Sequence, residues 1–312
     1  MSEQRTRHFS RDEIMALDPV QVADAMAAAL AMVSRGAAVA PVRGHIDFGD
    51  GAATFLISGA LTEPDLLSVK VINVRPRNPE HGLERLQGSL TVFESSTGRA
   101  LATLDARVAT EVRTAACSAV SMRLMARENA RVLTVFGTGP QGAAHLRALT
   151  AEKDFDEVRI VGRNEGAARK LASSFPGAKA FSADDALRGA HVVVTATNST
   201  IALFPDAAVE RGAHLAMVGG GSPQASEIEP ELLGRAAAIR VDHRPTCLHE
   251  AGEIVKAIAA GFITEDAVRE LGEVVLGLAP GRTGADDITI YKSVGNGTQD
   301  AALAALLLGI HV

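Results

Sequence analysis

The spacing of apolar and polar residues changes from helical to strand-like and back along the chain. Residues 18–34 carry apolar residues at helical spacing, with Pro19 near the start, where proline is tolerated, and Gly36 beyond the end. Residues 39–104 instead hold short apolar pieces, such as LLSVKVINV and GSLTVFE, separated by Gly, Pro, Asn and Asp. This pattern predicts one helix and then a mostly antiparallel sheet, with a hairpin turn in ESSTGRA around Gly98.

Helical spacing returns over residues 110–126, and from Ala130 onward predicted strands and helices alternate. The predicted strands are continuous apolar runs, which is typical of strands buried on both faces. They cover residues 132–136, 157–161, 192–197, 213–218, 237–241 and 288–293, and the segment TQDAALAALLLGI predicts a closing helix. The alternation predicts an α/β protein with a parallel sheet and helices on both of its faces.

Composition narrows the class of protein. A chain of 312 residues with 47% hydrophobic and 22% charged residues is typical of a soluble globular protein with two domains or one large one. The net charge of −6 argues against a broad nucleic-acid-binding surface, and the longest apolar run, AALAALLLGI, is too short to span a bilayer. Cys117 and Cys247 make no disulfide framework. We therefore expect a cytoplasmic protein that binds neither nucleic acid nor membrane.

Three glycines mark the passage from the first predicted strand of the second half into a helix. Gly137, Gly139 and Gly142 fit the pattern G-x-G-x-x-G, and another predicted strand, EVRIVG, follows at the distance of a βαβ unit. In this motif the first glycine permits the turn, the second lets the backbone approach a pyrophosphate, and the third lets the helix pack closely. The alternative is a glycine-rich turn with no ligand. Expected cofactor contacts here are Gly137, Thr138, Gly139, Pro140, Gln141 and Gly142.

The turn after the second strand bears on which dinucleotide is bound. An NAD site usually has Asp or Glu at this position, whereas IVGRNEG places Arg163 and Asn164 there. A guanidinium suits a 2′-phosphate, so we favour NADP(H), although Glu165 keeps NAD(H) open and a solvated loop arginine is the structural alternative. Further expected cofactor contacts are Thr114, Thr197, Asn198, Val218 and Gly219.

Three basic residues of the first half are candidates for binding a carboxylate. Lys70 lies inside an apolar strand pattern, where a buried ammonium needs an anion, and Arg113 falls in the first turn of a predicted helix, where the dipole disfavours cations. Arg43 lies in APVRGH. A bound carboxylate would account for these charges, and buried ion pairs or snorkelling side chains are the alternative.

A fourth group has residue types that ligate metals. It comprises His243, Cys247, His249 and Glu250, but their spacing fits no standard zinc pattern, so no metal is predicted. Asp242 ends a predicted strand, where it would face a cofactor cleft or cap the next helix.

Taken together, these motifs resemble the ornithine cyclodeaminase/μ-crystallin family of nicotinamide-dependent enzymes. The resemblance rests on GSLTVFESSTGRALATLDARVATEVRTAACSAV, GTGPQGAAH, VVVTATNS, GAHLAMVGGGSPQASEIEPELL, RVDHRPTCLHEAGEI and ITIYKSVGNGTQD. It implies a discontinuous α+β substrate-binding and dimerisation domain, residues 1–118 plus 294–312, around a Rossmann-type domain, residues 119–293. It also implies a homodimer joined through the β-rich domains, and Arg43, Lys70 and Arg113 match family positions that bind the substrate's carboxylate and neighbouring polar atoms.

One departure from the family pattern affects the expected reaction. By the resemblance, true ornithine cyclodeaminases carry an aspartate in the GGGSP segment that acts on the substrate amine, and Gly221 occupies that position here. Oxidation of an amine needs a base, whereas reduction of a protonated imine mainly needs a held carboxylate and orientation against the nicotinamide. Branches of the family related to μ-crystallin also lack this aspartate and reduce cyclic ketimines.

The sequence therefore predicts an NAD(P)H-dependent reductase of a small 2-imino carboxylate, most favourably a cyclic ketimine such as pyrroline-2-carboxylate or piperideine-2-carboxylate. Arg113 and Lys70 are the expected catalytic residues, with Lys70 or a water that it orders giving the proton to nitrogen. The alternatives are an alanine- or arginine-type amino-acid dehydrogenase, an ornithine cyclodeaminase and a cofactor-binding protein without catalysis.

Overall fold

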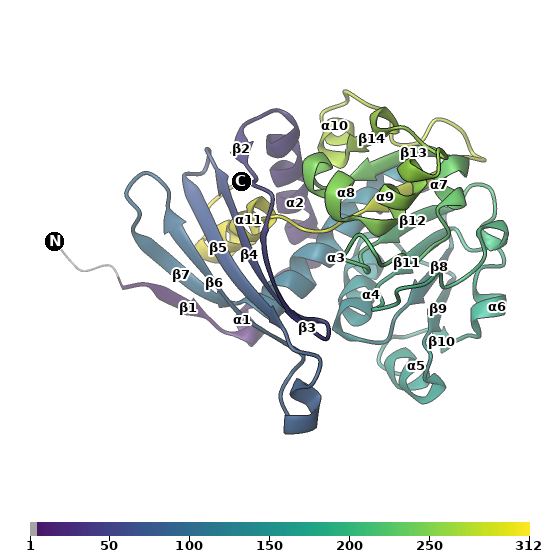
Figure 1. Ribbon diagram of the computed structural model, residues 1–312, viewed down its shortest axis with the longest axis horizontal. Coiled ribbons are helices and arrows are strands. Elements are labelled where there is room, and N and C mark those ends of the chain that lie inside the picture. The colour runs from purple at the N-terminus through teal and green to yellow at the C-terminus, as the bar shows by residue number, and fades with distance from the viewer. Residues whose placement is uncertain (1–4) are drawn as a thin grey trace. The chain divides into compact units, whose positions relative to one another are not determined.

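The computed structural model describes residues 5–312 and divides the chain into two compact units (Figure 1). Unit 1 contains the chain up to Arg113 together with Gly295–Val312, and unit 2 is Thr114–Val294. The sequence placed these boundaries after residues 118 and 293. The first boundary falls inside helix α3 (Ala106–Met125), so the chain passes from one unit to the next within a single helix.

Unit 1 is built on a seven-stranded sheet with the order β1-β7-β6-β5-β4-β2, in which β3 also pairs with β4. All its pairs are antiparallel except β1 with β7, so the predicted, mostly antiparallel sheet is confirmed. Gly98 has a φ of 72° in the turn between β6 and β7, as predicted. The strands are β1 (Arg7–Phe9), β2 (Ala38–Val39), β3 (Gly44–Gly49), β4 (Ala52–Leu61), β5 (Leu66–Val74), β6 (Leu86–Glu94) and β7 (Ala100–Asp105).

Helix α11 (Gly297–Leu308), drawn in yellow in Figure 1, packs against β4, β5 and helix α2 (Pro19–Ser34). Its first residue lies so close to β4 that a Cβ on Gly59 would collide with the Gly297 backbone, and the Ser68 hydroxyl donates to the Gly297 carbonyl at 2.7 Å. The start of α11 is thereby fixed over strand β5, which carries Lys70. Unit 1 also contains the short helix α1 (Arg11–Met15) and the 3-10 turn η1 (Asn78–His81).

Helix α3 begins four residues before the predicted start. The Asp105 carboxylate accepts hydrogen bonds from the backbone N–H groups of Arg107 and Val108, at 2.9 and 3.2 Å, and so caps the helix. The helix therefore starts at Ala106, and Arg113 lies in its interior. The argument that the helix dipole disfavours Arg113 was wrong, because that effect is confined to the first turn.

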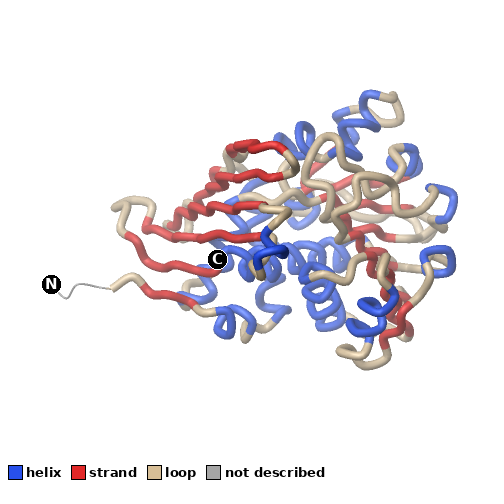
Figure 2. Tube along the Cα trace, turned by 60° about the horizontal axis from the view of Figure 1, so that its bottom comes forward, coloured by secondary structure: helices blue, strands red, loops and turns tan. Residues whose placement is uncertain are grey.

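Unit 2 contains an eight-stranded parallel sheet with the order β10-β9-β8-β11-β12-β15-β13-β14, shown in red in Figure 2. The predicted parallel sheet is confirmed, and β8 and β9 have the predicted bounds. Two strands, β10 and β14, were missed because each is only three residues long, too short to show an apolar run. The strands are β8 (Val132–Phe136), β9 (Glu157–Val161), β10 (Ala178–Ala180), β11 (Val192–Thr195), β12 (His214–Met217), β13 (Ala236–Val241), β14 (Val268–Glu270) and β15 (Ile288–Lys292).

The strand order reverses beside β8, since β9 and β10 follow on one side and β11 and β12 on the other. A crevice forms outside the carboxyl ends of the strands at such a reversal, and ligands bind there in open α/β sheets. The helices of unit 2 beyond α3 are α4 (Pro140–Glu152), α5 (Glu165–Ala172), α6 (Ala183–Ala186), α7 (Glu231–Arg235), α8 (Arg244–Glu250), α9 (Gly252–Ala259) and α10 (Leu271–Val275), with 3-10 turns η2 (Asp206–Ala208) and η3 (Glu265–Ala267).

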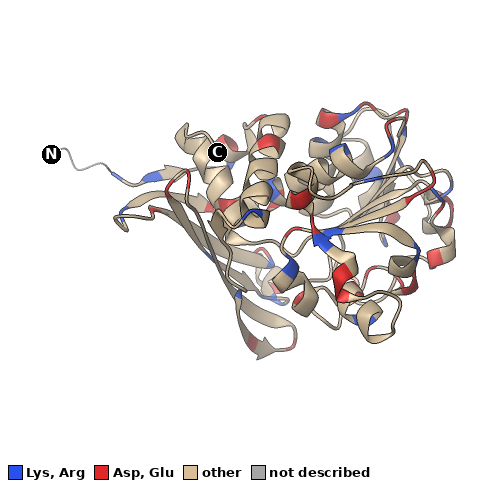
Figure 3. Cartoon of the chain, turned by 90° about the horizontal axis from the view of Figure 1, so that it is seen from above, with Lys and Arg blue, Asp and Glu red and all other residues tan. Residues whose placement is uncertain are grey.

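Acidic and basic residues occur on both units (Figure 3). Within residues 5–312, no helix combines the length and apolar character needed to cross a membrane.

Candidate active site

The three glycines of the turn after β8 are held by different constraints. Gly137 has a φ of 126°, and a Cβ there would collide with the carbonyl oxygen of Ala196. A Cβ on Gly142 would collide with the carbonyl oxygen of Gly137. A Cβ on Gly139, by contrast, would meet no described protein atom within 4 Å. The space over Gly139 is thus left open at the N-terminus of α4, where backbone N–H groups suit a phosphate.

A cavity of about 1010 Å³ opens at this turn. Six of the predicted cofactor residues line it, namely Gly137, Thr138, Gly139, Arg163, Thr197 and Asn198. Pro140, Gln141 and Gly142 form the first turn of α4, and Val218 and Gly219 follow strand β12. The Asn164 side chain instead caps α5 by accepting the Ala167 N–H at 3.0 Å. The cavity lies at the strand-order reversal, so its place and its glycine-lined floor suit a dinucleotide.

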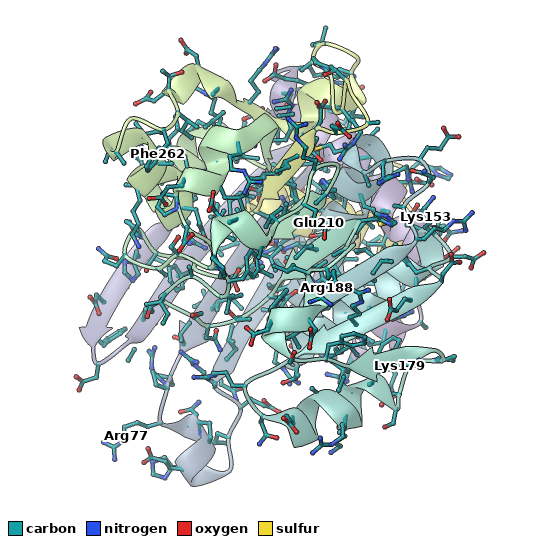
Figure 4. The ribbon with its side chains drawn as sticks, turned by 90° about the vertical axis from the view of Figure 1, so that its right-hand side faces the viewer. Arg77, Lys153, Lys179, Arg188, Glu210 and Phe262 are labelled. Atoms are coloured by element: carbon teal, nitrogen blue, oxygen red, sulfur yellow. The ribbon has the colours of Figure 1, made fainter. Side chains whose placement is uncertain are left out.

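The end of the cavity beside α5 and β10 is basic. It is lined by Arg163 and by Lys179 of the edge strand β10, which Figure 4 labels. Neither forms an ion pair within residues 5–312, whereas Arg169 is paired with Glu165 at 2.8 Å. Lys179 was missed because it lies in an unpredicted strand. The Glu165 carboxylate, which had kept an NAD site open, is engaged by a neighbour on its own helix.

Thr114 also has spare hydrogen-bonding capacity. Its hydroxyl is buried and has no hydrogen-bond partner among the described residues. A buried hydroxyl without a partner is unfavourable, so it is a candidate for contact with a bound polar group.

In unit 1, a group that we term the cation cluster comprises Arg43, Lys70 and Arg113 around Asp300. Lys70 Nζ lies 2.7 Å from Asp300 Oδ2 and donates to Thr110 Oγ1 at 3.1 Å. Arg113 Nη1 donates to Gln299 Oε1 at 2.9 Å, and its Nε lies 3.6 Å from Asp300 Oδ1. Lys70, Arg113 and Asp300 are 1, 4 and 0% exposed. One buried carboxylate therefore faces two buried cations.

The third cation, Arg43, is half-buried and stacks over the Phe55 ring at 4.6 Å. It is close enough to repel the Lys70 ammonium. Burial lowers the pKa of Lys70 to about 8; the attraction of Asp300 opposes this, and repulsion from Arg113 and Arg43 adds to it. Lys70 can thus carry a proton at neutral pH and release it within the range in which many enzymes work.

Asp300 changes the interpretation of Lys70. We expected its charge to require a bound carboxylate, but the chain itself supplies a counter-ion, which corresponds to the ion-pair alternative. Asp300 was not among the predicted site residues, although the segment YKSVGNGTQD that contains it was noted. The two residues are 230 positions apart, so one sequence gives no sign that they meet. Because Asp300 is shared between two cations, a net positive charge still remains for an anionic ligand.

The GGGSP segment lies near two buried acids that sequence reasoning also missed. A Cβ on Gly220 would lie 3.4 Å from Glu253 Oε1, and the Glu227 carboxylate accepts the Gly219 N–H at 2.9 Å. Both acids are 0% exposed, and Glu253 Oε2 is paired with Lys292 Nζ at 3.2 Å. These carboxylates are engaged within the fold, so neither is placed as an obvious replacement for the aspartate that Gly221 lacks.

The residues with metal-ligating side chains are used for packing and local hydrogen bonds. Cys247 Sγ donates to Asp242 Oδ1 at 3.4 Å, and burial raises the pKa of the thiol. His243 Nδ1 lies 2.7 Å from Thr246 Oγ1, and Asp242 accepts the Ser293 hydroxyl at 2.9 Å. Across the described part of the chain, no three His, Cys, Asp or Glu side chains form a group that would hold a metal ion.

The pattern of the ornithine cyclodeaminase/mu-crystallin family matches residues 9–308, which is nearly all of the chain. The chain belongs to this family. The resemblance inferred from the motifs is therefore confirmed, and so is the fold class that it implied.

Two curated relatives show how similar individual members are. The chain is 30% identical over 295 residues to Delta(1)-pyrroline-2-carboxylate reductase of Bacillus cereus, covering 92% of this chain and 90% of that protein. It is 32% identical over 245 residues to ketimine reductase mu-crystallin of Mus musculus, covering 78% of this chain and 75% of that protein.

Two solved structures have the same fold throughout. Delta(1)-pyrroline-2-carboxylate reductase of Thermococcus litoralis, in complex with NADH and L-proline, superposes with a TM-score of 0.91 at 25% identity, over 98% of this chain and 99% of that one. An archaeal alanine dehydrogenase dimer with bound NAD has a TM-score of 0.90 at 29% identity, over 97% and 95% of the two chains.

Proposed function

We propose that this protein is an NAD(P)H-dependent reductase of a small 2-imino carboxylate, most favourably a cyclic ketimine. The observation that carries the proposal is the cation cluster, in which two buried cations share one carboxylate. The reaction also requires a nicotinamide cofactor, and the glycine turn of unit 2 has the sequence and shape to bind one. Two relatives are named as reductases of C=N substrates, and this agrees with the proposal.

The residues of unit 2 fit a nicotinamide dinucleotide. The open space over Gly139, the N-terminus of α4 and the unpartnered Thr114 hydroxyl are all suited to phosphate oxygens. When bound, a reduced nicotinamide supplies hydride to the carbon of a C=N bond. The work of this part of the chain is to bind and orient that cofactor.

The cation cluster would hold and protonate the substrate. The planar Arg113 guanidinium binds a carboxylate with two parallel hydrogen bonds, and Arg43 adds positive charge. Lys70, with its pKa lowered to about 8, would give a proton to the imine nitrogen, directly or through an ordered water. Asp300 keeps the Lys70 side chain in place through the contact at 2.7 Å.

The finer choice of cofactor is NADP(H). Arg163 and Lys179 line one end of the cavity without ion-pair partners in residues 5–312, and two cations suit a 2′-phosphate. The Glu165 carboxylate, the group that would favour a 2′-hydroxyl, is paired with Arg169. Both similar solved structures contain NADH or NAD, so the preference of this chain rests on its own basic residues.

The test is a panel of preformed imines with each nicotinamide. Purified protein is mixed with pyrroline-2-carboxylate, piperideine-2-carboxylate, or a 2-oxo acid with ammonia, and cofactor oxidation is followed by absorbance. We expect oxidation of NADPH with at least one cyclic imine and formation of the corresponding L-amino acid. Cofactor binding without oxidation on any imine would support a non-catalytic binding protein, and ammonia release from ornithine without net cofactor turnover would support a cyclodeaminase.

The second candidate is an amino-acid dehydrogenase. One observation favours it: Lys70 can lose its proton near pH 8 and Asp300 is adjacent, so the pair can accept a proton from an amine. The similarity to an alanine dehydrogenase agrees with this reading. Assays in the oxidative direction at pH 9–10 with alanine, arginine and proline distinguish the two. If an acyclic amino acid gives a kcat/KM above that of every cyclic imine, the second candidate replaces the first.

We also propose that the protein forms a homodimer through unit 1. Helices α2 and α11 cover one face of its sheet, while Leu56 and Val69 lie on the other face with 46 and 40% exposure. The neighbouring strand β3 adds Ile46 and Phe48 at 45 and 60%. Such a contiguous apolar surface is typical of an interface. Light scattering after size-exclusion chromatography should give twice the chain mass, and Val69→Lys should shift the protein toward monomer.

A further inference from the structure

The loops that follow β11 and β12 are joined by one buried carboxylate. Glu227, which is 0% exposed, accepts the Thr197 N–H at 2.7 Å and the Thr197 hydroxyl at 2.6 Å on Oε1. Its Oε2 accepts the Thr195 hydroxyl at 2.7 Å and the Gly219 N–H at 2.9 Å. We term this arrangement of Glu227 with Thr195, Thr197 and Gly219 the carboxylate clamp.

The donor set of the carboxylate clamp demands an acceptor oxygen at both positions of the side chain. Burial raises the pKa of Glu227, while the attraction of Lys292 and the hydrogen bonds from Thr197 and Thr195 oppose this. Each of the two oxygens receives one backbone N–H, which can only donate, and one hydroxyl, which can rotate. A carboxamide of the same shape has only one oxygen, so its NH₂ group would face either the Thr197 N–H or the Gly219 N–H. Glutamine would therefore release one of the two loops while occupying nearly the same volume.

Lys292 and Glu253 also fix the Gly219 loop through hydrogen bonds and an ion pair. Lys292 Nζ donates to the Gly219 carbonyl and pairs with Glu253, whose Oε1 accepts the Glu227 N–H at 3.0 Å. A Cβ on Gly219 would collide with the Glu227 carboxylate and with the Thr197 carbonyl oxygen. The two loops thus touch and share partners, and neither can move without breaking buried hydrogen bonds.

Of the two clamped loops, the one after β11 lines the cofactor cavity. Thr197 and Asn198 line it, and the carbonyl oxygen of Ala196 packs directly against Gly137, the first glycine of the turn. Any displacement of residues 196–199 would therefore alter both the wall of the cavity and its floor.

We propose that Glu227 is a positioning residue that holds the loops after β11 and β12 in the arrangement that receives the dinucleotide. This inference rests on the proposed function, because it requires that the cavity bind a nicotinamide cofactor. Glu227 acts through Thr197 and Gly219 and has no need to touch the cofactor itself.

The experiment compares Glu227→Gln with Glu229→Gln. Glu229 provides a matched control, since its Oε2 also accepts a backbone N–H, but that N–H belongs to Asp206, at 2.7 Å, which does not line the cavity. Direct titrations of NADPH and NADH against the full-length proteins give the dissociation constants. We expect Glu227→Gln to raise them about tenfold or more and Glu229→Gln to leave them within twofold, in line with the loss of one buried hydrogen bond.

Two further measurements separate weaker cofactor binding from a loss of folded protein. Loss of folded protein alone would lower the number of binding sites without raising the dissociation constant, so stoichiometry is fitted separately. Thr195 donates its hydroxyl to Glu227 but does not line the cavity. Thr195→Val removes this hydroxyl from the carboxylate clamp and Thr195→Ser restores it; we expect weaker binding only for valine. This pair tests the inference even if Glu227→Gln does not fold.

The possible failures are distinguishable. If the wild-type protein binds neither nicotinamide, the proposed function is wrong. If the wild type binds and Glu227→Gln binds equally well, or Thr195→Val matches Thr195→Ser, the inference about Glu227 is wrong and the proposed function stands.

Discussion

The cation cluster of unit 1 and the carboxylate clamp of unit 2 both bury ionisable side chains, but they differ in how much hydrogen-bonding capacity is left unused. In the cation cluster of unit 1, one carboxylate faces two buried cations, and Arg113 Nε has no hydrogen-bond partner among the described residues. In the carboxylate clamp of unit 2, four donors saturate the two oxygens of Glu227. Spare capacity on a buried charge indicates a place for a ligand, whereas saturation indicates a role in holding the fold.

The largest expected effect comes from removing the cation with spare capacity. Arg113→Ala should lower kcat/KM by about 100-fold or more, which is roughly 3 kcal/mol, because a bidentate charge-assisted contact with the substrate is lost. Steady-state kinetics on the best imine measure this change. Arg123→Ala is the control, since Arg123 lies on the same helix but pairs with Glu152 at 2.6 Å. Equal activity of both variants would remove Arg113 from the site.

The next effect concerns the shared carboxylate. Asp300 raises the pKa of Lys70, which burial lowers to about 8, so Asp300→Asn should lower that pKa further. If protonated Lys70 is the donor, activity falls as the pH rises through its pKa. The basic limb of the pH–rate profile should then move down by about one unit, which means about tenfold lower activity at high pH.

The control for the pH–rate profile of Asp300→Asn is a variant of a carboxylate outside the site. Glu80→Gln alters an exposed carboxylate of the same unit, paired with Arg77 at 3.3 Å, and should leave the limb in place. A profile unchanged in Asp300→Asn would show that Lys70 does not set the basic limb.

A smaller effect is expected at the basic end of the cofactor cavity, where Arg163 and Lys179 have no ion-pair partner among residues 5–312. Arg163→Ala should weaken NADPH binding by about tenfold, roughly 1.4 kcal/mol, because one exposed contact to a phosphate is lost. NADH binding should change little. Arg188→Ala, an exposed arginine of the same unit outside the cavity, serves as the control (Figure 4). Equal weakening of both nicotinamides would contradict the assignment of NADP(H).

The smallest expected effect is a loss of stability at low pH, caused by two buried histidines of unit 2 that are held in the neutral form. Burial lowers the pKa of His145 to about 4 and that of His214 to about 3, while their nitrogens contact Ser118 and Ser121 at 2.9 and 3.1 Å. The unfolded chain has the higher pKa, near 6.5, so it takes up protons first as the pH falls. Stability is complete above pH 6.5 and declines below it.

The expected size of this loss is roughly 1 kcal/mol for each histidine at pH 5.5. Denaturant unfolding between pH 7.5 and 5 measures it. His145→Gln should reduce the slope of stability against pH by up to one proton, whereas His311→Gln, at an exposed position, should not. If His145→Gln keeps the full slope, other groups cause the acid sensitivity.

The sequence predicted those elements that can be recognised from a short stretch of consecutive residues. Strands β8 and β9 were predicted residue by residue, because both are rich in large apolar residues and the polar residues inside them, Thr134 and Arg159, are single and flanked by apolar ones. The glycine turn was recognised because its spacing is fixed by backbone geometry. The start of α3 was misplaced because its cap, Asp105, is also the last residue of β7, so the helix follows the strand directly without a turn to mark the change. Local patterns therefore predicted the sheets well and the helix start poorly.

The partners of the charged site residues were beyond a single sequence. Lys70 was singled out correctly as a charge in an apolar strand, yet its counter-ion Asp300 lies 230 positions away. Glu227 has no local mark at all, since SEIEPELL looks like an ordinary polar loop before a helix. Its role emerges only when strand order brings the ends of β11 and β12 together.

The open space over Gly139 shows that the fold itself does not require a glycine at this position of the motif. With φ at −83° and no described atom near a new Cβ, alanine fits there without strain, unlike at Gly137 or Gly142. Gly139→Ala should therefore have the same melting temperature as the wild type in calorimetry, but it should not bind NADPH or NADH. Such a variant would be a folded reference that does not bind the cofactor, and it would show that glycine is required at this position for ligand binding rather than for stability.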